Sequence, residues 1–196
     1  LQRADILDSS PEEPFENIVR LVKAILGVPI VAVSRVDSDR QWFKASLGLG
    51  YGETPRSMSF CSVAIQDSAP LIVPDATADS RFRDNPLVTS DPHIRSYAGI
   101  PLKLEGAFQV GSLCAIDRVP REFTAGEIAV LENFASLVVQ EIELRNLAHR
   151  DTLTGAMSRR AFHEAVEREV SRCGRYTHES CLIVFDIDRF KRINDT

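Results

Sequence analysis

Near the start of the chain, apolar residues recur at every third or fourth position, as they do on the buried face of an amphipathic helix. We expect the helix to begin close to Ser10, because serine followed by Pro11 and Glu13 is typical of a helix start, although Pro14 leaves the first residue open. It should end at Gly27, because glycine readily adopts the left-handed conformation of a helix cap. The apolar positions are Phe15, Ile18, Val19, Val22 and Ile25.

Two pairs of short apolar runs, each pair separated by a turn, predict two β-hairpins. In the first, residues 28–36 pair with residues 41–46 across the polar turn 37–40. In the second, residues 100–104 pair with residues 111–116 across a turn that contains glycine. Because helices and strands are segregated along the chain, the expected fold class is α+β, with a central, mostly antiparallel sheet flanked by helices.

A second helix is predicted from the capping box formed by Thr124 and Glu127. Its apolar residues form two stripes, so one stripe can pack on the sheet while the other pairs with a second chain. We therefore expect residues 124–150 to form a long linker or signalling helix, and the protein to be a homodimer through it. The first stripe is Ile128, Leu131, Ala135, Val138 and Ile142; the second, interrupted by Glu141, is Val130, Phe134, Leu137, Leu144 and Ala148.

Composition limits the size and the partners of the protein. With 196 residues, of which 44% are hydrophobic, the chain can bury one good core and part of another. The formal net charge is -5 and no basic cluster combines with aromatic residues, which argues against a nucleic-acid partner. No apolar run is long enough to cross a membrane and the start does not resemble a signal peptide, so we expect a cytoplasmic protein with no membrane segment.

The four cysteines show neither a Cys-x-x-Cys pair nor the spacing of a zinc site. Cys61 and Cys114 each lie inside an apolar element, where a free cysteine behaves as a small hydrophobic residue, so we expect both to pack in the core. The alternative is a thiol-based redox sensor or enzyme that uses these two residues, which thiol exposure and reactivity would reveal.

Several blocks of residues between Phe15 and Leu144 resemble, in the same order, the pattern of GAF domains. The resemblance implies a GAF-like antiparallel sheet flanked by helices. It also implies a small-molecule sensor or a dimerisation module, of the kind often placed before cyclase domains. We assign residues 13–144 to this domain and residues 1–12 to an N-terminal lead-in. The matching blocks are residues 60–65, 71–76, 79–86, 95–102 and 111–117.

A ligand pocket in the GAF region should involve polar residues on long loops, because loops on a rigid sheet carry function disproportionately. The sequence does not identify an effector. In the alternative interpretation, Asp75 and Asp79 cap turns while Arg81 and Arg95 pair with them and hold the loop together. The candidate pocket residues are Phe60, Cys61, Asp75, Asp79, Arg81, Asn85, Arg95 and Tyr97.

The last residues of the chain are of types that bind metal ions and nucleotides. Residues 181–185 are apolar and Asp186 follows, a pattern that predicts a buried strand ending in a carboxylate suited to Mg²⁺. On the short helix expected next, Lys191 could meet a phosphate and Asn194 a base edge. In the alternative interpretation, Asp188 caps the helix and Lys191 is solvated.

Residues 186–196 resemble the nucleotide-binding segment of GGDEF diguanylate cyclases, and residues 151–162 resemble the segment that opens such domains, at matching spacing. We therefore assign residues 151–196 to an incomplete α/β GGDEF domain. Ala156 and Ser158 depart from the family, which usually has Leu and Asn there, without touching the nucleotide residues. By resemblance, Asp186 and the carbonyl of Ile187 hold Mg²⁺, Lys191 contacts GTP phosphates and Asn194 contacts guanine.

No Gly-Gly-Asp/Glu-Glu-Phe motif occurs in these residues, so we expect the chain by itself not to make cyclic di-GMP. We expect both ends to be cut, with the motif beyond Thr196. The strand at 181–185 would then lack its sheet partners. In the parent protein, a change in the GAF domain would shift the helix pair from Val130 to His149 and align two GTP-bearing domains. The alternative is a binding or dimerisation module with a degenerate cyclase domain.

Overall fold

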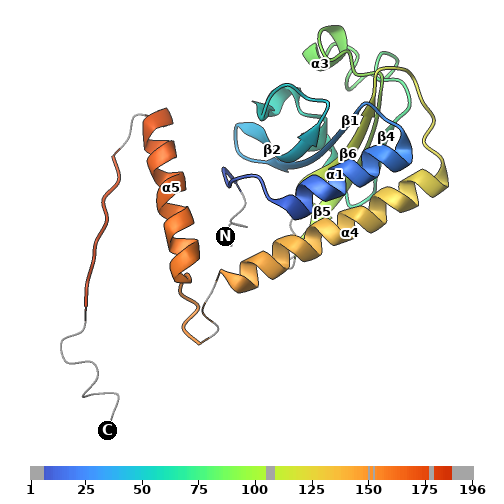
Figure 1. The fold of residues 1–196 in the computed structure, drawn as a ribbon. Helices are drawn as coiled ribbons and strands as arrows, with labels where there is room; N and C mark the ends of the chain where they lie inside the picture. Colours follow the sequence, from blue (N-terminus) through green and yellow to red (C-terminus); the bar gives the residue numbers. More distant parts are fainter. Residues whose placement is uncertain (1–6, 105–108, 150, 152, 177–178, 187–196) are drawn as a thin grey trace. The chain divides into compact units, whose positions relative to one another are not determined.

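The computed structural model describes residues 7–104, 109–149, 151, 153–176 and 179–186 (Figure 1). The chain divides into two compact units, Leu1–Ser158 and Arg159–Thr196. The first unit contains every element except the last helix. In chain order the elements are α1 (Glu13–Leu26), β1 (Ile30–Val36), β2 (Arg40–Leu47), β3 (Glu53–Pro55), the 3-10 helix η1 (Arg56–Met58), α2 (Phe60–Ala64), β4 (Leu71–Val73), α3 (Pro86–Thr89), β5 (Ser96–Lys103), β6 (Gln109–Asp117), α4 (Ala125–Ala148) and α5 (Arg159–Tyr176).

The first unit is built on a six-stranded sheet with the order β3-β2-β1-β6-β5-β4, in which every described pairing is antiparallel. Both predicted hairpins are confirmed, as β1–β2 and β5–β6. Pairing of β1 with β6, where Ala32 lies opposite Cys114, joins the two hairpins into one sheet. The short edge strands β3 and β4 were not predicted from the sequence. The predicted α+β fold class is confirmed.

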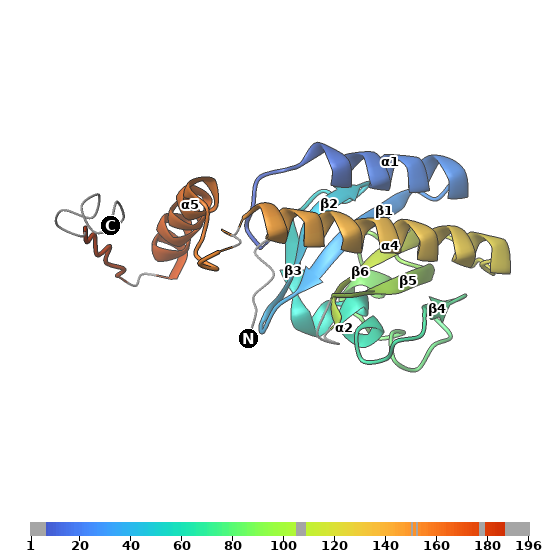
Figure 2. The same cartoon turned by 90° about the horizontal axis from the view of Figure 1, so that it is seen from below.

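Helices α1 and α4 lie side by side on one face of the sheet, whereas α2 lies on the other (Figure 2). Because side chains alternate along a strand, β1 contributes to two cores. Val31 and Val33 join the core under α1 and α4, and Ile30 and Ala32 join the core under α2, α3 and the loops. The second of these cores surrounds the candidate site.

Helix α1 begins two residues later than the sequence suggested. Its N-cap is Glu12, not Ser10, and the Glu12 side chain makes no capping hydrogen bond. That carboxylate instead accepts hydrogen bonds from Lys44 and Arg145, while Lys44 also donates to the carbonyl oxygen of Ser10 at 2.7 Å. Residues 10–12 are therefore held against the sheet and do not form the first helical turn. The predicted end is confirmed, with Gly27 in the left-handed conformation at φ 65°.

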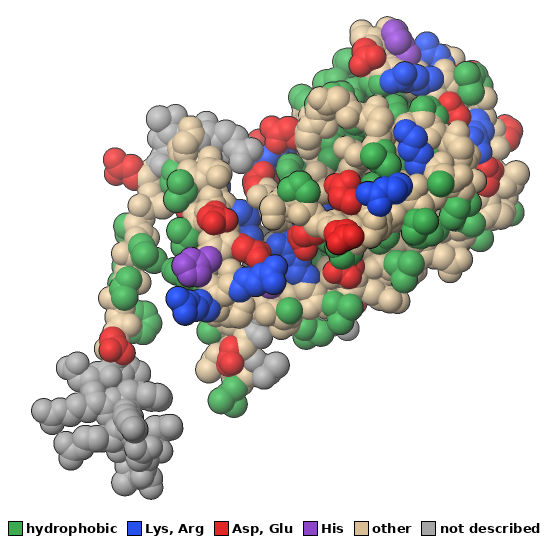
Figure 3. Space-filling model, viewed as in Figure 1, with side chains coloured by type: hydrophobic (Ala, Val, Ile, Leu, Met, Phe, Trp, Pro, Cys, Tyr) green, Lys and Arg blue, Asp and Glu red, His purple; other side chains and the backbone are tan. Residues whose placement is uncertain are grey.

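Helix α4 begins at the predicted capping box, in which the side chains of Thr124 and Glu127 each accept a hydrogen bond from the other's backbone. The stripe that contains Leu131, Val138 and Ile142 is buried, and hydrophobic side chains also line the outer surface of α4 (Figure 3). Among the helices of the described residues, none is both long and apolar enough to cross a membrane. The large exposed apolar side chains of α4 are Leu137, Leu144 and Leu147, with 48%, 62% and 70% exposure.

The second unit contains α5 followed by the chain segment 179–186, which is neither helix nor strand. The strand predicted over residues 181–185 is therefore not formed. Leu182, Ile183, Val184 and Phe185 are all exposed. A strand is stable only when a neighbouring strand satisfies its backbone groups, and no described segment of this unit supplies one. The short helix predicted next lies outside the described residues.

Candidate functional site

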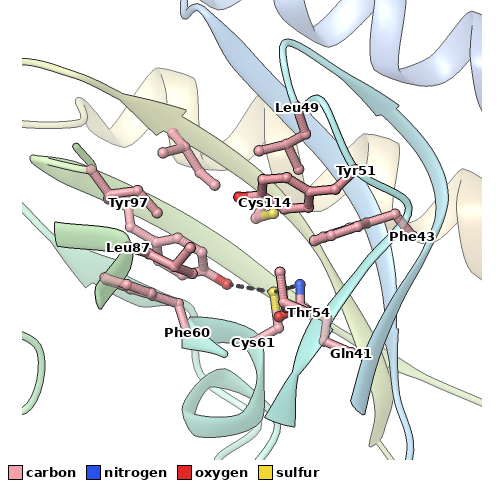
Figure 4. A pocket seen from close by; sticks show the side chains of 12 residues that line it. Gln41, Phe43, Leu49, Tyr51, Thr54, Phe60, Cys61, Leu87, Tyr97 and Cys114 are labelled. Atoms are coloured by element: carbon pink, nitrogen blue, oxygen red, sulfur yellow. Dashed lines mark hydrogen bonds between the residues drawn. The ribbon is translucent and has the colours of Figure 1, made fainter. Parts of the chain in front are cut away.

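A pocket opens on the face of the sheet opposite α1 and α4 (Figure 4). Its volume is about 320 Å³ with the solvent at its mouth included. The enclosed part has room for a molecule about the size of water. The lining comes from β2, β3, β5, β6, α2, α3 and two loops, and consists of Gln41, Phe43, Leu49, Tyr51, Thr54, Phe60, Cys61, Leu87, Ile94, Tyr97, Cys114 and Ile116.

The polar centre of this pocket is the buried thiol of Cys61. The side-chain amide of Gln41 donates a hydrogen bond to its sulfur at 3.1 Å, and the hydroxyl of Tyr97 lies 3.3 Å from the same atom (Figure 4). The Tyr97 hydroxyl also lies 3.4 Å from the hydroxyl of Ser112, which is 3.5 Å from that of Ser34. A continuous polar chain therefore crosses an otherwise apolar face of the sheet.

These contacts make the two pocket thiols unequal. Burial by itself raises the pKa of the Cys61 thiol, but hydrogen bonds from Cys114, Ser112, Ser34 and Tyr97 stabilise the thiolate more strongly and lower this pKa below its ordinary value. The hydrogen bond with Cys61, together with burial, raises the pKa of Cys114 well above its ordinary value. Burial likewise raises the pKa of the Tyr97 phenol. The contacts point the same way, since Gln41 and Tyr97 lie within hydrogen-bond distance of the Cys61 sulfur and favour its thiolate, whereas the Cys114 thiol faces the carbonyl oxygen of Ala32.

The position of the Tyr97 hydroxyl depends on a glycine in the same strand. Gly99 is two residues further along β5, so it shares the face of Tyr97. A Cβ at position 99 would lie 2.2 Å from the Tyr97 hydroxyl oxygen, which is far too close. The Tyr97 ring also packs on Phe60, whose ring centroid is 5.2 Å away. The absent side chain of Gly99 therefore leaves the space through which the phenol reaches Cys61.

The eight residues predicted for the pocket divide into two groups. Phe60, Cys61 and Tyr97 line it. Both cysteines of the pocket are buried, as the core-packing prediction required, but they also make the polar contacts described above. The five that lie outside its lining are Asp75, Asp79, Arg81, Asn85 and Arg95.

The acidic members of the second group organise turns. Asp75 accepts hydrogen bonds from the backbone and the hydroxyl of Thr77 at 2.9 and 2.7 Å, and these bonds hold the pKa of Asp75 below its ordinary value. Asp79 forms an ion pair with Arg81 at 2.6 Å, which lowers the pKa of Asp79 in the same way. These contacts match the structural alternative for the two aspartates and for Arg81.

The remaining two members hold backbone groups. The side chain of Asn85 accepts a hydrogen bond from the backbone of Leu87 at the start of α3 and donates one to the carbonyl of Met58 at 3.0 Å. Arg95 donates to the carbonyl oxygens of Val88 and Ile94 at 2.9 and 3.0 Å. Its positive charge also helps to lower the pKa of Asp75, so Arg95 interacts with an aspartate through its charge and not through an ion pair in contact. All five residues therefore stabilise the loops beside the pocket.

Sequence reasoning missed the polar residues that strands β2 and β3 bring to the pocket. Gln41 and Thr54 lie opposite each other in the β2–β3 pairing, so both side chains share one face. The Thr54 hydroxyl is buried and finds no hydrogen-bond partner among the described residues. The available signal was the presence of Ser34 and Ser112 within otherwise apolar strands, because buried polar residues need polar neighbours.

Of the four residues predicted to bind metal or nucleotide, the structure describes one. Asp186 is exposed at the end of the segment that follows α5, whereas Ile187, Lys191 and Asn194 lie outside the described residues. Asp186 offers the type of oxygen ligand that Mg²⁺ takes. No group of three or more His, Cys, Asp or Glu side chains in the described part of the chain is arranged to hold a metal. The Mg²⁺ site therefore remains a prediction.

The segment that resembles the opening of GGDEF domains forms an ordered turn around Asp151. Its carboxylate accepts hydrogen bonds from the backbone and the hydroxyl of Thr154 at 2.8 and 2.7 Å, which lower the pKa of Asp151. Gly155 follows with a positive φ of 69°, a conformation that favours glycine. The backbone of Ser158 then donates to the carbonyl of His149, closing the turn against the end of α4.

Comparison with known proteins agrees with both resemblances. The family model for the GAF domain matches residues 10–142, and the model for the diguanylate cyclase GGDEF domain matches residues 148–196. A cyclic di-GMP phosphodiesterase of Pseudomonas aeruginosa is 42% identical over 174 residues, which are 88% of this chain and 30% of the relative. Diguanylate cyclase DgcP of Escherichia coli is 28% identical over 116 residues, 52% of this chain and 34% of the relative. The chain thus spans about a third of each relative.

Solved structures support the fold of the first unit. The GAF domain of an Acinetobacter phosphoenolpyruvate-protein phosphotransferase superimposes with a TM-score of 0.56 at 18% identity, covering 73% of this chain and 89% of that one. Free methionine-R-sulfoxide reductase from Neisseria meningitidis has a TM-score of 0.57 at 22% identity and covers 68% and 78% of the two chains. The chain therefore belongs to the GAF family, and a short part of a GGDEF domain follows its GAF domain.

Proposed function

We propose that this chain is the sensory part of a cytoplasmic protein that controls the level of cyclic di-GMP. The observation that carries the proposal is the order of the two domains, a GAF domain followed directly by the start of a GGDEF domain. Relatives named as a cyclic di-GMP phosphodiesterase and as a diguanylate cyclase support it. In this proposal a small molecule enters the GAF pocket, and α4 transmits the change to the C-terminal domain.

The leading form of the proposal is a diguanylate cyclase that condenses two GTP into cyclic di-GMP. Asp186 and the carbonyl of Ile187 would hold Mg²⁺, which supplies charge stabilisation for the phosphates. Lys191 would bind GTP phosphate and Asn194 the guanine edge. Without a Gly-Gly-Asp/Glu-Glu-Phe motif, residues 1–196 alone are expected to be inactive.

A second form is a protein that degrades cyclic di-GMP. The specific observation in its favour is the 42% identity with the Pseudomonas aeruginosa phosphodiesterase over 88% of this chain. In that form the GGDEF region binds nucleotide or serves as a spacer, and hydrolysis takes place in a domain beyond residue 196. The two forms share the same sensory region and differ in the direction of turnover.

The proposal is tested on a protein in which residues 1–196 are followed by a complete GGDEF domain. We expect it to convert GTP to cyclic di-GMP, and Asp186→Ala to lower the rate by at least about 100-fold, because a metal-binding carboxylate stabilises charge by several kcal/mol. Product is measured by chromatography. Asp84→Asn, a change at a 91% exposed loop carboxylate, is the matched control and should leave the rate unchanged.

Other outcomes of this assay separate the alternatives. Consumption of added cyclic di-GMP, with no synthesis from GTP, would replace the first form by the second. A folded protein that neither makes nor degrades cyclic di-GMP would contradict both forms and indicate a non-enzymatic module.

Homodimerisation through α4 is the structural part of the proposal. Val130, Leu137 and Leu144 repeat every seven residues along α4, which is the spacing of a coiled-coil seam with a second copy. Val130 is partly buried against the core, so the free part of this stripe begins at Leu137. Leu137 and Leu144 are 48% and 62% exposed in the single chain. A second α4 would cover them and align the two C-terminal domains.

Analytical ultracentrifugation of residues 1–196 tests this dimer. We expect a species of twice the 21.8 kDa chain mass, and we expect Leu144→Glu to weaken association at least tenfold by placing an unpaired charge in the seam. Ser136→Glu, at an exposed position of α4 away from the stripe, is the control. A wild-type protein that remains monomeric at every concentration tested would contradict this part of the proposal.

A further inference from the structure

The pocket brings two free cysteines together from elements that are far apart in the chain. Cys61 comes from α2 and Cys114 from the centre of β6, and each is only 1% exposed. Both line the pocket. The Tyr97 hydroxyl, which is 3.3 Å from the sulfur of Cys61, lies over Gly99, and Gly99 is the cross-strand neighbour of Cys114. The second unit holds the other two cysteines, Cys173 and Cys181. The pocket therefore contains two neighbouring thiols. Apolar packing alone would not need two cysteines at the same place.

The same pocket has polar groups and enclosed space that could bind a small polar molecule. Thr54 contributes a buried hydroxyl with no hydrogen-bond partner among the described residues, and its cross-strand neighbour Gln41 contributes the amide that already contacts Cys61. The enclosed space beside them is about the size of a water molecule. A small, uncharged oxidant such as hydrogen peroxide fits this combination, whereas a bulky oxidant does not.

From this geometry we propose that the pocket is a thiol oxidation site, in which hydrogen peroxide converts Cys61 and Cys114 to an intramolecular disulfide. Such a site goes beyond the proposed nucleotide function, because it needs no residue past position 117. It assigns a covalent modification to the sensory domain itself.

The reaction balances in two steps. In the first, the thiolate of Cys61 attacks one peroxide oxygen, the O–O bond breaks, and the departing hydroxide takes up a proton to leave as water, giving a sulfenic acid. In the second, the thiol of Cys114 loses its proton and attacks that sulfur, the S–O bond breaks, and a second water leaves. Two thiols and one peroxide thus yield one disulfide and two waters.

The contacts of the two thiols assign their roles. Cys61 is surrounded by Gln41 and Tyr97, whose hydrogen bonds favour its thiolate, so Cys61 attacks the peroxide. Cys114 keeps its proton more firmly and donates a hydrogen bond to the backbone carbonyl of Ala32, which suits the thiol that resolves the sulfenic acid. Disulfide formation would remove the Cys61 thiol from Gln41 and Tyr97, so oxidised and reduced pockets would present different hydrogen-bonding groups to a ligand.

The test uses the full 196-residue chain with Cys173→Ser and Cys181→Ser, which leaves only the two pocket thiols. After treatment with a small molar excess of hydrogen peroxide, free thiols should fall from two to none per chain. Non-reducing peptide mass spectrometry should show a Cys61–Cys114 linkage that dithiothreitol reverses. Unchanged thiols in the folded protein, or linkage only between chains, would overturn the proposal.

Single-cysteine variants in the same background separate the two roles. With Cys114→Ser, oxidation of Cys61 should stop at the sulfenic acid, which dimedone traps as an adduct. With Cys61→Ser, Cys114 should react at least about tenfold more slowly, because it has lost the thiolate partner and keeps its proton. Equal reactivity of the two variants would contradict the assignment. Should either variant fail to fold, as judged by circular dichroism, the parent with both pocket thiols still decides whether the disulfide forms.

Discussion

Replacement of Phe82 by alanine should lower the free energy of unfolding of the first unit by about 4 kcal/mol, as is typical when a buried phenylalanine is truncated. Phe82 is 2% exposed and its ring stacks on Phe60 at a centroid distance of 4.0 Å. Phe60 in turn supports Tyr97 and lines the pocket. The cavity left by Phe82 would therefore lie directly behind the pocket wall, within the core formed by α2, α3 and the loops.

Urea unfolding followed by tryptophan fluorescence measures this effect. Trp42 is the single tryptophan of the chain and lies in β2, so its fluorescence reports on the first unit alone. The matched control is Phe162→Ala in α5, where the ring is 42% exposed in the second unit and the change should stay within about 0.5 kcal/mol. A loss below about 1 kcal/mol for Phe82→Ala would show that the second core does not depend on this aromatic stack.

Glu12→Gln should destabilise the same unit by about 3 kcal/mol, because it removes a carboxylate from two buried cations. The side chain of Lys44 in β2 has no exposed surface and that of Arg145 in α4 is 8% exposed. Both donate to the same oxygen of Glu12. This one carboxylate therefore links the residues just before α1, strand β2 and the end of α4.

The measurement is again urea unfolding with Trp42 as the probe, with Glu13→Gln as the control. Glu13 is the next residue and is exposed, so its neutralisation should change stability by less than about 0.5 kcal/mol. In a Lys44→Met background, Glu12→Gln should be less damaging by at least about 1 kcal/mol, because one of the two buried cations is gone. Additive effects in this double-mutant cycle would show that Glu12 and Lys44 do not interact.

Local patterns were sufficient for most elements of the first unit. Helical periodicity, the glycine cap at Gly27 and the capping box at Thr124 and Glu127 each depend on residues within a few positions of one another, and both helix signals at Gly27 and Thr124 are confirmed. The periodicity was wrong at one position of α1, because Ile25 is 57% exposed and Leu26 is buried in its place. Alternating apolar runs likewise predicted both hairpins. Such signals can be read from the sequence because their physical cause is local.

Sequence patterns gave wrong predictions of secondary structure where contacts with distant residues outweigh a local preference. Ser10 carries a good helix-start signal, but Lys44, 34 positions away, binds its carbonyl oxygen and holds the lead-in on the sheet. The apolar run 181–185 has the composition of a strand, yet a strand also needs a neighbour, and no described segment of the second unit provides one. Composition alone contains neither piece of information.

The sequence by itself determined the fold class, the position of the long helix and the family resemblances, because these depend on periodicity and on motifs that are contiguous in the chain. Of the eight residues predicted for a ligand pocket, Phe60, Cys61 and Tyr97 line the cavity, and ligand binding there stays a prediction. Only the tertiary structure decided that Gln41, Thr54 and Cys114 complete the pocket. Strand pairing brings Gln41 beside Thr54, and the packing of α2 on β6 brings Cys61 to Cys114. Contacts between residues so far apart in the chain depend on pairing and packing across the whole sheet, which no local pattern encodes.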